Sequence, residues 1–583
     1  MWSGYSRRET PQEHSTPSGD NANAVTIRCE KDMNMPEQHG ADFYKAIGKD
    51  TLPFDDRSLA EQIAHHASVR GENPAMLFGD QKISYRQYNE LAGQLANALE
   101  SIGLKKGDVV GIHMPNIPQY ALTLVAASKM GCVCSGISPL LTPSEVAFQI
   151  KDASIKVVLT LDLFAGIYAG LGEAVSRLDA VVVTGALDVF MPSEVALPES
   201  DVINFIHYTA LVDGQPTQRE TEPVHWNDTF MLQYTGGTTG KPKGVELSVR
   251  NVMHNSTQYS ASTPWLEGED IIASAFPFFH IAGLSIIFAG ARSGGMMMLL
   301  PDPRDTEHFC NQMKAYPPTV LGAVPALYEM LLATPQFKEI DFSRLRVAYT
   351  GAAPLTSATF EALNNVLGKN KISDMFGMTE TSPCFASNPP SRYKVGSVGM
   401  AVPGAEIRIV SLDEAKTDMP IGEPGEILAT GPQVMKGYLN LPEETANSLR
   451  EIDGKVWMCT GDVGYLDEEG YLFLCDRAKD MLIVGGYKVF SVELEDKLQS
   501  LPQVAMSAVI GKADEKRPGN EIVTLYVELA EDYKDADPVE MQKVIKEYCV
   551  NNMAAYKVPK EIHIIDAIPL TPVGKIDKKA LRN

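Results

Sequence analysis

The residues with the clearest chemical potential lie in one short loop, Tyr234 to Val245, which reads Y-T-G-G-T-T-G-K-P-K-G-V. Glycines let backbone N–H groups turn toward an anion, threonine hydroxyls donate to phosphate oxygens, and ammonium groups offset negative charge. The loop is not a Walker A motif, because Thr235 replaces the first glycine of that motif and Pro242 follows Lys241. We predict a polyphosphate-binding loop of another kind, with the contacts Thr235, Gly236, Gly237, Thr238, Thr239, Gly240, Lys241 and Lys243.

Four further motifs follow this loop, and the five together resemble the signature motifs of the acyl-adenylate-forming superfamily. They read D-M-F-G-M-T-E-T-S-P at 374–383, T-G-D-V-G at 460–464, D-R-A-K-D-M-L-I-V-G-G-Y-K-V-F-S-V-E-L-E at 476–495 and P-L-T-P-V-G-K-I-D at 569–577. This superfamily includes acyl-CoA synthetases, firefly luciferase and the adenylation domains of peptide synthetases. The resemblance implies an enzyme that uses ATP and Mg²⁺ to convert a carboxylic acid to an acyl-adenylate and then to a thioester of CoA.

The resemblance also implies roles for individual residues at the reacting centre. Attack of a carboxylate on the α-phosphorus of ATP builds negative charge, so the site needs cations and backbone dipoles rather than an acid–base pair. Lys575 corresponds to the catalytic lysine of the family, and Glu380 corresponds to its Mg²⁺ ligand, a hard oxygen donor. The catalytic group that we predict consists of Lys575, Glu380, Thr379 and His280.

A second set of residues is expected to hold the nucleotide. Phe376, where most relatives carry Tyr, corresponds to an aromatic that stacks on adenine, and Asp374 corresponds to a residue near the adenine amino group. Asp462 corresponds to the carboxylate that accepts both ribose hydroxyls, and Arg477 corresponds to a second ribose contact. The other residues expected at this site are Gly351, Ala352, Ala353, Met375 and Gly377.

Two chemical steps at one carbon imply that part of the chain moves. Lys575 must reach the phosphate in the first step, yet the thiol of CoA must reach the same carbon in the second. By resemblance, a small C-terminal domain rotates about Lys479 between the steps. The loop that then lines the pantetheine channel consists of Gly485, Gly486 and Tyr487. The chain departs from the family at Lys488 and Ser491, where relatives usually have Asn and Pro.

The acyl group is expected beside Phe276 to Gly283, which reads F-P-F-F-H-I-A-G and resembles the family motif at the acyl pocket. His280 corresponds to the gate position, and we expect it to form a pocket wall rather than a base, because a carboxylate at pH 7 is already ionised. The stretch contains no Asp or Glu, whereas relatives that activate amino acids need one to pair with the substrate ammonium. The predicted pocket residues are His280, Gly322, Ala323, Ala353 and Gly377.

Small and apolar side chains at these positions favour a medium- or long-chain fatty acid as the substrate. An aryl acid is the first alternative, and an acyl-AMP ligase that loads a separate carrier protein is the second. Outside the enzymes, the alternative is a catalytically silent protein that keeps the fold and binds a nucleotide or an acyl group. The chain ends soon after Lys575, so we expect no carrier domain within it.

Composition limits the partners and the compartment. A net charge of -23 over 583 residues argues against a nucleic acid or an anionic membrane as a general partner. The eight cysteines have no disulfide or zinc spacing, and the apolar stretch from Ile281 to Leu300 is interrupted by Arg292. Since no signal segment opens the chain, we expect a cytoplasmic protein without a transmembrane segment, and a homodimer is left open.

Alternating helical and apolar segments predict the scaffold that positions these motifs. The helical and strand-like runs alternate at 85–101, 109–113, 118–130, 133–137 and 156–161. This alternation is typical of a parallel sheet covered on both faces, and a second run of this kind spans 271–353. Between 398 and 475, short strands and turns indicate an antiparallel barrel or a small sheet instead.

We therefore predict an α/β protein whose large N-terminal domain contains two doubly wound sheets and a β-barrel-like subdomain, followed by a small mobile α+β domain. A length of 583 residues fits several folding units. Residues 1–40 are rich in Ser, Thr, Pro and Asn and are expected to form a disordered extension. The boundary between the large domain, 41–476, and the small domain, 477–583, follows from the hinge of the family and not from composition.

Overall fold

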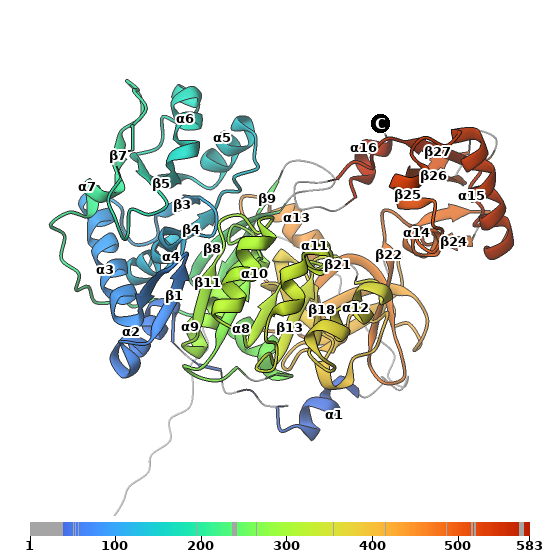
Figure 1. Ribbon diagram of the computed structural model, residues 1–583, viewed down its shortest axis with the longest axis horizontal. Coiled ribbons are helices and arrows are strands. Elements are labelled where there is room, and N and C mark those ends of the chain that lie inside the picture. Colours follow the sequence, from blue (N-terminus) through green and yellow to red (C-terminus); the bar gives the residue numbers. More distant parts are fainter. Residues whose placement is uncertain are drawn as a thin grey trace, which may run out of the picture. The chain divides into compact units, whose positions relative to one another are not determined.

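The computed structural model describes most of the chain from residue 39 to residue 582 (Figure 1). The described ranges are 39–49, 52, 54–55, 57–193, 195–235, 242–263, 265–353, 355–413, 416–485, 487–514, 517, 520–570 and 576–582. The predicted extension, 1–40, lies outside these ranges except for its end, where helix α1 (His39–Ala46) begins.

The first sheet has eight strands and carries the predicted phosphate loop. Its strands are β3 Val109–His113, β4 Val133–Gly136, β5 Ile155–Leu161, β6 Ala180–Thr184, β7 Phe205–His207, β8 Thr229–Thr235, β9 Lys243–Ser248 and β19 Gly437–Tyr438. The order is β19-β9-β8-β4-β3-β5-β6-β7, and all pairs from β8 to β7 are parallel. Strands β9 and β19 complete one edge in antiparallel pairs, which the helix–strand alternation did not indicate.

The second sheet has nine strands and carries the D-M-F-G motif. Its strands are β1 Pro74–Phe78, β2 Gln81–Ser84, β10 Ile271–Ser274, β11 Met296–Leu299, β12 Val320–Gly322, β13 Val347–Gly351, β14 Ile372–Gly377, β15 Cys384–Ser387 and β16 Met400–Ala401. The order is β16-β15-β14-β13-β12-β10-β11-β1-β2. The pairs from β14 to β1 are parallel, whereas β2, β15 and β16 join the edges in antiparallel pairs. A short 3-10 turn, η4 (Thr379–Thr381), follows β14.

Helices link these strands, and several begin where the sequence predicts. The helices of this region are α2 Leu59–Arg70, α3 Tyr85–Ser101, α4 Pro118–Met130, α5 Pro143–Asp152, α6 Asp162–Leu171, α7 Tyr208–Val212, α8 Val249–Gln258, α9 Ile281–Ser293, α10 Thr306–Ala315, α11 Pro325–Ala333 and α12 Ser357–Leu367. Ser58 with Glu61 forms a capping box at α2, and Thr142 with Glu145 forms one at α5. Of the helices that the structure describes, none is both long enough and apolar enough to cross a membrane.

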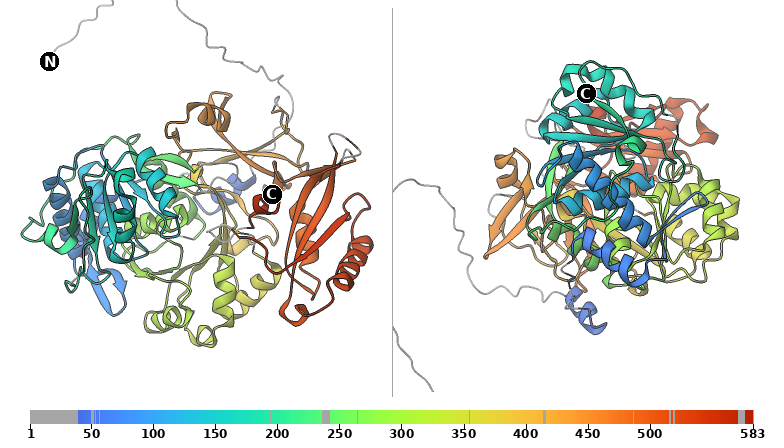
Figure 2. Two further views of the ribbon diagram at one scale, coloured as in Figure 1. Left: turned by 90° about the horizontal axis from the view of Figure 1, so that it is seen from above. Right: turned by 90° about the vertical axis from the view of Figure 1, so that its left-hand side faces the viewer.

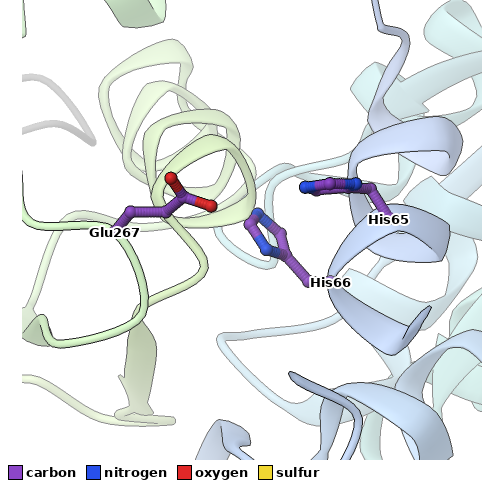
Figure 3. A group of neighbouring side chains, drawn as sticks. All are labelled: His65, His66 and Glu267. Atoms are coloured by element: carbon purple, nitrogen blue, oxygen red, sulfur yellow. The ribbon is translucent and has the colours of Figure 1, made fainter. Parts of the chain in front are cut away.

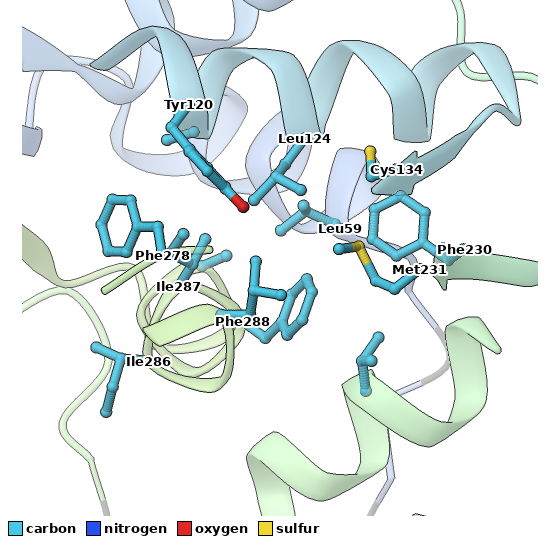
Figure 4. Packing of buried hydrophobic residues seen from close by; sticks show 14 of the residues in the cluster. Leu59, Tyr120, Leu124, Cys134, Phe230, Met231, Phe278, Ile286, Ile287 and Phe288 are labelled. Atoms are coloured by element: carbon cyan, nitrogen blue, oxygen red, sulfur yellow. The ribbon is translucent and has the colours of Figure 1, made fainter. Parts of the chain in front are cut away.

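The main hydrophobic core joins helices of both sheets (Figure 4). Tyr120 and Leu124 on α4 face Ile287 and Phe288 on α9, and Met231 of β8 lies beside them. Separate clusters cover the other faces, with α5 and α6 packed on β5 and β6, and α10, α11 and α12 packed on β12 and β13. Both sheets are therefore covered on both faces, which confirms the predicted α/β class.

A third sheet follows, made of antiparallel strands, of which β21 is the longest with 12 residues. Its strands are β17 Glu406–Val410, β18 Gly425–Thr430, β20 Leu449–Ile452, β21 Lys455–Leu466 and β22 Leu472–Arg477, and helix α13 (Pro442–Ser448) precedes β20. The order is β17-β18-β21-β20, with β22 also paired to β21. Strand β19 lies between β18 and β20 in the chain but pairs with β9 of the first sheet. The predicted small antiparallel sheet is thus present, and one of its connections returns to the phosphate-loop strands.

The last segment folds as a small α/β unit with its own apolar cluster (Figures 1 and 2). Its elements are β23 Leu482–Val484, β24 Tyr487–Val489, α14 Ser491–Leu498, β25 Val504–Ala513, β26 Glu521–Leu529, α15 Pro538–Asn552, β27 Glu561–Ile565 and α16 Lys578–Arg582. Strand β26 pairs antiparallel with β25 and parallel with β27, and α15 packs on one face of this sheet. The predicted small C-terminal fold is confirmed.

Candidate functional site

The predicted phosphate loop joins the antiparallel strands β8 and β9. Their last register pair is Thr235 with Lys243, so the two ends of the loop lie side by side. Gly236, Gly237, Thr238, Thr239, Gly240 and Lys241 lie outside the described residues. The ammonium of Lys243 lies 2.5 Å from Glu444 Oε2 and 4.8 Å from the centre of the Tyr438 ring. A cation therefore stands where the loop ends.

The predicted metal ligand Glu380 lies in η4 and is only 6% exposed. The hydroxyl of Tyr438 donates to Glu380 Oε1 over 2.7 Å, and the backbone N–H of Met435 donates to the Glu380 carbonyl over 2.9 Å. Burial raises the pKa of the Glu380 carboxyl, whereas the Tyr438 hydroxyl and the charges of Arg477 and Lys243 act in the opposite direction. Two cations of the predicted site, Lys243 and Arg477, are thus close enough to act on the Glu380 carboxyl.

The oxygen donors around Glu380 fit a hard divalent cation. Glu380 contributes a carboxylate and its neighbour Thr379 contributes a hydroxyl, and Mg²⁺ binds such oxygens together with phosphate oxygens. Within the described part of the chain, Glu380 forms no salt bridge, and Arg477 and Lys243 act on its carboxyl only through their more distant charges. A buried carboxylate in this situation is stabilised when a cation binds to it.

Tyr438 is a functional candidate that no sequence motif indicated. It lies in the two-residue strand β19, which carries no hydrophobic period that could have revealed it. A surface cavity of about 420 Å³ opens beside it, lined by Glu246, Lys436, Gly437, Tyr438, Pro442, Thr445, Ala446 and Leu449. In the sequence, the only signal for the K-G-Y tripeptide at 436–438 is its position between the second motif, 374–383, and the third, 460–464.

Strands β13 and β14 bring the predicted nucleotide residues together. Their parallel register pairs Gly351 with Met375. Asp374 is 7% exposed, and burial raises its pKa to about 8, against the opposing effect of the Met375 backbone amide. The Phe376 ring packs edge-to-face on Phe385 with 5.1 Å between the ring centres, which restrains its orientation.

Two backbone positions near these strand ends restrict the residue type. A Cβ on Gly377 would lie 1.8 Å from the carbonyl oxygen of Pro383, so only glycine fits at the start of the turn that carries Glu380. Ala352 has a positive φ of 67°, and both Ala352 and Ala353 are exposed. The end of β13 therefore presents small side chains at the surface.

The predicted acyl-pocket loop is held by two polar side chains that the sequence did not single out. Asn116 donates to the Phe276 carbonyl over 3.0 Å and accepts from the Phe278 N–H over 2.8 Å. Gln233 donates to the Phe279 carbonyl over 2.6 Å. Since Gln233 lies on β8, directly before the phosphate loop, this bond connects the phosphate-loop strand to the acyl-pocket loop.

The remaining predicted pocket residues lie on either side of this loop. His280 is the N-cap of α9, and its Nδ1 accepts from the Ala282 N–H over 3.3 Å. A Cβ on Gly322 would lie 3.2 Å from the Phe276 ring, so β12 approaches the loop closely at this point. Ala323 is fully buried. These contacts join β12 to the segment that precedes α9.

Asp462 and Arg477, the predicted ribose contacts, are partners across β21 and β22. They form a register pair, and Arg477 Nε lies 3.1 Å from Asp462 Oδ1. The Arg477 side chain is 45% exposed, and the Asp462 side chain is 13% exposed. Lys479 lies two residues after Arg477, and burial lowers the pKa of its ammonium. The ribose residues therefore lie together at the start of the predicted hinge.

The predicted site in the small C-terminal fold is described only in part. The backbone N–H of Gly485, at a φ of 62°, donates to Asn520 Oδ1. Tyr487 is 59% exposed and stacks on Tyr556 with 4.6 Å between the ring centres. The other two predicted residues of this fold, Gly486 and Lys575, lie outside the described residues.

A second group of side chains has the residue types of a metal site but lies elsewhere (Figure 3). His65 and His66 of α2 and Glu267 offer ligand atoms that all lie within 4.8 Å of one another. Arg70 already donates to Glu267 Oε1 over 2.7 Å, and Nε2 of His66 lies 3.3 Å from the Arg292 carbonyl. Because these partners already engage two members, we interpret the group as a polar contact between α2, α9 and the loop that carries Glu267.

Two family profiles match the chain. The profile described as "AMP-binding enzyme" matches residues 63–439, and the profile described as "AMP-binding enzyme C-terminal domain" matches residues 493–575. Both matches follow the order of the motifs found in the sequence.

Curated relatives match over nearly the whole chain. A long-chain-fatty-acid–CoA ligase of Yersinia pestis is 32% identical over 547 residues, covering 90% of this chain and 94% of the relative. One of Bacillus subtilis is 32% identical over 553 residues, covering 91% and 95%. A 4-coumarate–CoA ligase of Pinus taeda is 29% identical over 544 residues, covering 92% and 95%.

Solved structures share the fold. The anthranilate CoA ligase AuaEII in complex with anthranoyl-AMP superposes with a TM-score of 0.79 at 26% identity, covering 91% of this chain and 97% of that one. ATP-bound MatB of Rhodopseudomonas palustris superposes with a TM-score of 0.78 at 28% identity, covering 90% and 98%.

Proposed function

Because the chain belongs to the AMP-binding enzyme family, as an AMP-forming acid–CoA ligase, we propose that its substrate is a medium- or long-chain fatty acid. The observation that carries this proposal is the loop before α9, where Phe276 and Phe278 are buried and no Asp or Glu occurs between Phe276 and Leu284. An apolar wall without a carboxylate suits an uncharged acyl chain. The relatives from Yersinia pestis and Bacillus subtilis carry the name long-chain-fatty-acid–CoA ligase, which supports the same choice.

An aryl acid is the second candidate for the substrate. The Pinus taeda relative is named for 4-coumarate, and the solved AuaEII structure is named for anthranilate. The aromatic side chains Phe276, Phe278 and Phe279 could also pack against a flat ring.

In the first step, we propose that Lys575 orients the substrate carboxylate and offsets the charge that builds on the α-phosphate. Glu380 and Thr379 would hold Mg²⁺, which when bound neutralises charge on the phosphate oxygens. Lys243 lies at the end of the phosphate loop, where its ammonium can pair with a phosphate oxygen. Asp462 would accept the ribose hydroxyls, as a carboxylate can because hydroxyls donate.

For the second step, we propose CoA as the acceptor and Lys479 as the hinge about which the small domain, 477–583, turns against the large domain, 41–476. The family profile for the C-terminal domain, which begins at residue 493, supports a separate unit after Lys479. Gly485, Gly486 and Tyr487 would then line the channel for pantetheine. Tyr487 is exposed, so it is accessible to such a ligand.

The proposal is tested with a panel of acids. Exchange of pyrophosphate into ATP is measured for saturated fatty acids of increasing length, for 4-coumarate and for anthranilate, and CoA consumption is followed as loss of free thiol. We expect exchange and thiol loss with the fatty acids, and much slower turnover with the aryl acids. Faster turnover of an aryl acid would overturn the fatty-acid assignment, and exchange without thiol loss would exclude CoA as the acceptor.

A pair of variants separates the two steps. Lys575→Ala is expected to slow adenylation by on the order of 10² to 10³ while CoA transfer from supplied acyl-AMP is retained. Lys479→Pro is expected to retain adenylation and to slow CoA transfer, because proline stiffens the hinge. Equal losses in both steps for either variant would contradict the assigned role.

A further inference from the structure

We propose that Tyr438 is a positioning residue that holds the Glu380 carboxylate ready for the divalent cation bound with ATP. The inference rests on the proposed role of Glu380. It adds a residue that lies outside the five sequence motifs and acts through Glu380 rather than on the substrate.

The contact between the two side chains is close and buried. The Tyr438 hydroxyl donates to Glu380 Oε1 over 2.7 Å, and the two residues are 8% and 6% exposed. A hydrogen bond to a carboxylate in such surroundings is stronger than one between neutral groups. It is the one hydrogen bond from another residue's side chain to Glu380 in the described part of the structure.

Backbone bonds fix the strand that carries Tyr438. Strand β19 pairs with β9, and Tyr438 lies opposite Val245. The N–H of Leu439 donates to the Gly244 carbonyl over 2.8 Å, and the N–H of Tyr438 donates to Thr445 Oγ1 over 2.9 Å. These bonds fix the backbone from which the Tyr438 side chain reaches Glu380.

The same segment also holds the turn that carries Glu380. The N–H of Met435 donates to the Glu380 carbonyl over 2.9 Å, and the N–H of Lys436 donates to the Glu246 carbonyl over 3.0 Å. Residues 435–439 thus bond to η4 at one end and to the phosphate-loop strand at the other. This segment sets the distance between the carboxylate and the phosphate loop.

One aromatic ring contacts both charges of the proposed site. The Lys243 ammonium lies 4.8 Å from the centre of the Tyr438 ring, and the hydroxyl of that ring contacts Glu380. The ring keeps the cation near its face and the carboxylate at its edge, so the two opposite charges do not pair directly. Glu380 is thus kept apart from Lys243, whose ammonium pairs with Glu444 instead.

The test measures metal binding rather than turnover. Mn²⁺, which has an electron paramagnetic resonance signal, replaces Mg²⁺ and is titrated into the full chain saturated with a non-hydrolysable ATP analogue. Tyr438→Phe removes the hydroxyl and keeps the ring under Lys243. We expect Mn²⁺ to bind about 10- to 100-fold more weakly to this variant, the usual consequence of losing a partner of a metal ligand.

Two further variants show whether Tyr438 acts through Glu380. In a Glu380→Gln background, Tyr438→Phe is expected to cause no further loss of Mn²⁺ affinity, because the bond it removes no longer restrains a metal ligand. Tyr85→Phe is the matched control, since the buried Tyr85 hydroxyl donates to the Gly295 carbonyl over 2.8 Å at a different place. This control is expected to bind Mn²⁺ as the wild type does.

Wild-type affinity in Tyr438→Phe, or an equal loss in the Glu380→Gln background, would overturn the proposal. Thermal unfolding checks that each variant is folded, and Tyr438→His, which keeps a ring donor, replaces the Phe variant if that one does not fold. If the folded His variant binds Mn²⁺ as tightly as the wild type does, the result supports the proposal. If it loses Mn²⁺ affinity as completely as unfolded protein does, the result counts against the proposal. A failure of the proposed function can be distinguished from a failure of this inference, because in that case the wild-type protein itself would show no pyrophosphate exchange.

Discussion

Two buried carboxylates in this protein, Asp270 and Glu380, have very different surroundings. Asp270, just before β10, has no exposed side-chain surface, and it pairs with Arg346. It also accepts from Thr319 Oγ1 over 2.6 Å and from the Leu266 N–H over 2.7 Å. Glu380 is almost as deeply buried, yet its side-chain partner in the described structure is the neutral hydroxyl of Tyr438.

This difference separates a structural charge from one that is available to a ligand. The charge of Asp270 is offset within the chain, so its burial is stable without any other molecule. Among the described residues Glu380 has no such salt bridge, and burial raises the pKa of its carboxyl, so a bound cation would stabilise its charged form. Asp374 is a third case, because burial raises its pKa to about 8 and the group is then mostly neutral at pH 7.

The largest effect is expected for Glu380→Gln. The amide cannot bind a divalent cation as a carboxylate does, so adenylation should slow by on the order of 10² to 10³, equivalent to about 3–4 kcal/mol of transition-state stabilisation. The free energy of unfolding should not fall, because the substitution keeps the size of the side chain and leaves no buried charge. Pyrophosphate exchange and urea unfolding measure the two quantities. Glu469→Gln, at an exposed ion pair with Arg392, is the control and should change neither.

Asp270→Ala should give the opposite pattern. It removes the carboxylate that pairs with Arg346, whose side chain is 24% exposed, and we expect a loss of about 3 kcal/mol in the free energy of unfolding. Activity per folded molecule should stay near that of the wild type. Asp302→Ala, at an exposed pair with Arg304, should cost less than about 0.5 kcal/mol. If Asp270→Ala lowered exchange without lowering stability, the distinction between the two carboxylates would be wrong.

The smallest effect concerns Asp374 and appears as a dependence on pH. The folded pKa of about 8 lies above the value of about 3.9 for an unfolded aspartate, so between these values the unfolded chain binds fewer protons than the folded one. Stability from this group therefore falls as pH rises through that window. Asp374→Asn removes the dependence and should be more stable than the wild type by about 1–2 kcal/mol at pH 7, after allowing for burial of the amide.

Urea unfolding of both proteins at several pH values between 4.5 and 8 measures this effect. The difference between variant and wild type cancels the titration of the other groups. We expect that difference to grow in favour of the variant as pH rises. A difference that stays constant with pH would show that Asp374 is ionised in the folded protein.

Much of the scaffold could be predicted because its signals are local. A capping residue such as Ser58 or Thr142 bonds to N–H groups three residues away, so the chain need not be folded for the pattern to be readable. Helices 85–101 and 118–130 began and ended where their apolar periods did. The pairing of β19 with β9, by contrast, could not be predicted, since β19 has two residues and pairs with a strand far away in the chain.

The sequence by itself determined the order of the motifs, the alternation of helices and strands, and the residue types available for binding a nucleotide. Only the tertiary structure decided which of these residues are neighbours. Tyr438 and Glu380 are 58 positions apart, and their contact arises because β19 joins the edge of the first sheet rather than its own neighbours in the chain. Tertiary surroundings likewise decide that Asp270 is paired, that Glu380 forms no salt bridge with the residues that the structure describes, and that Asp374 holds its proton, because the cost of a charge depends on its surroundings and not on its residue type.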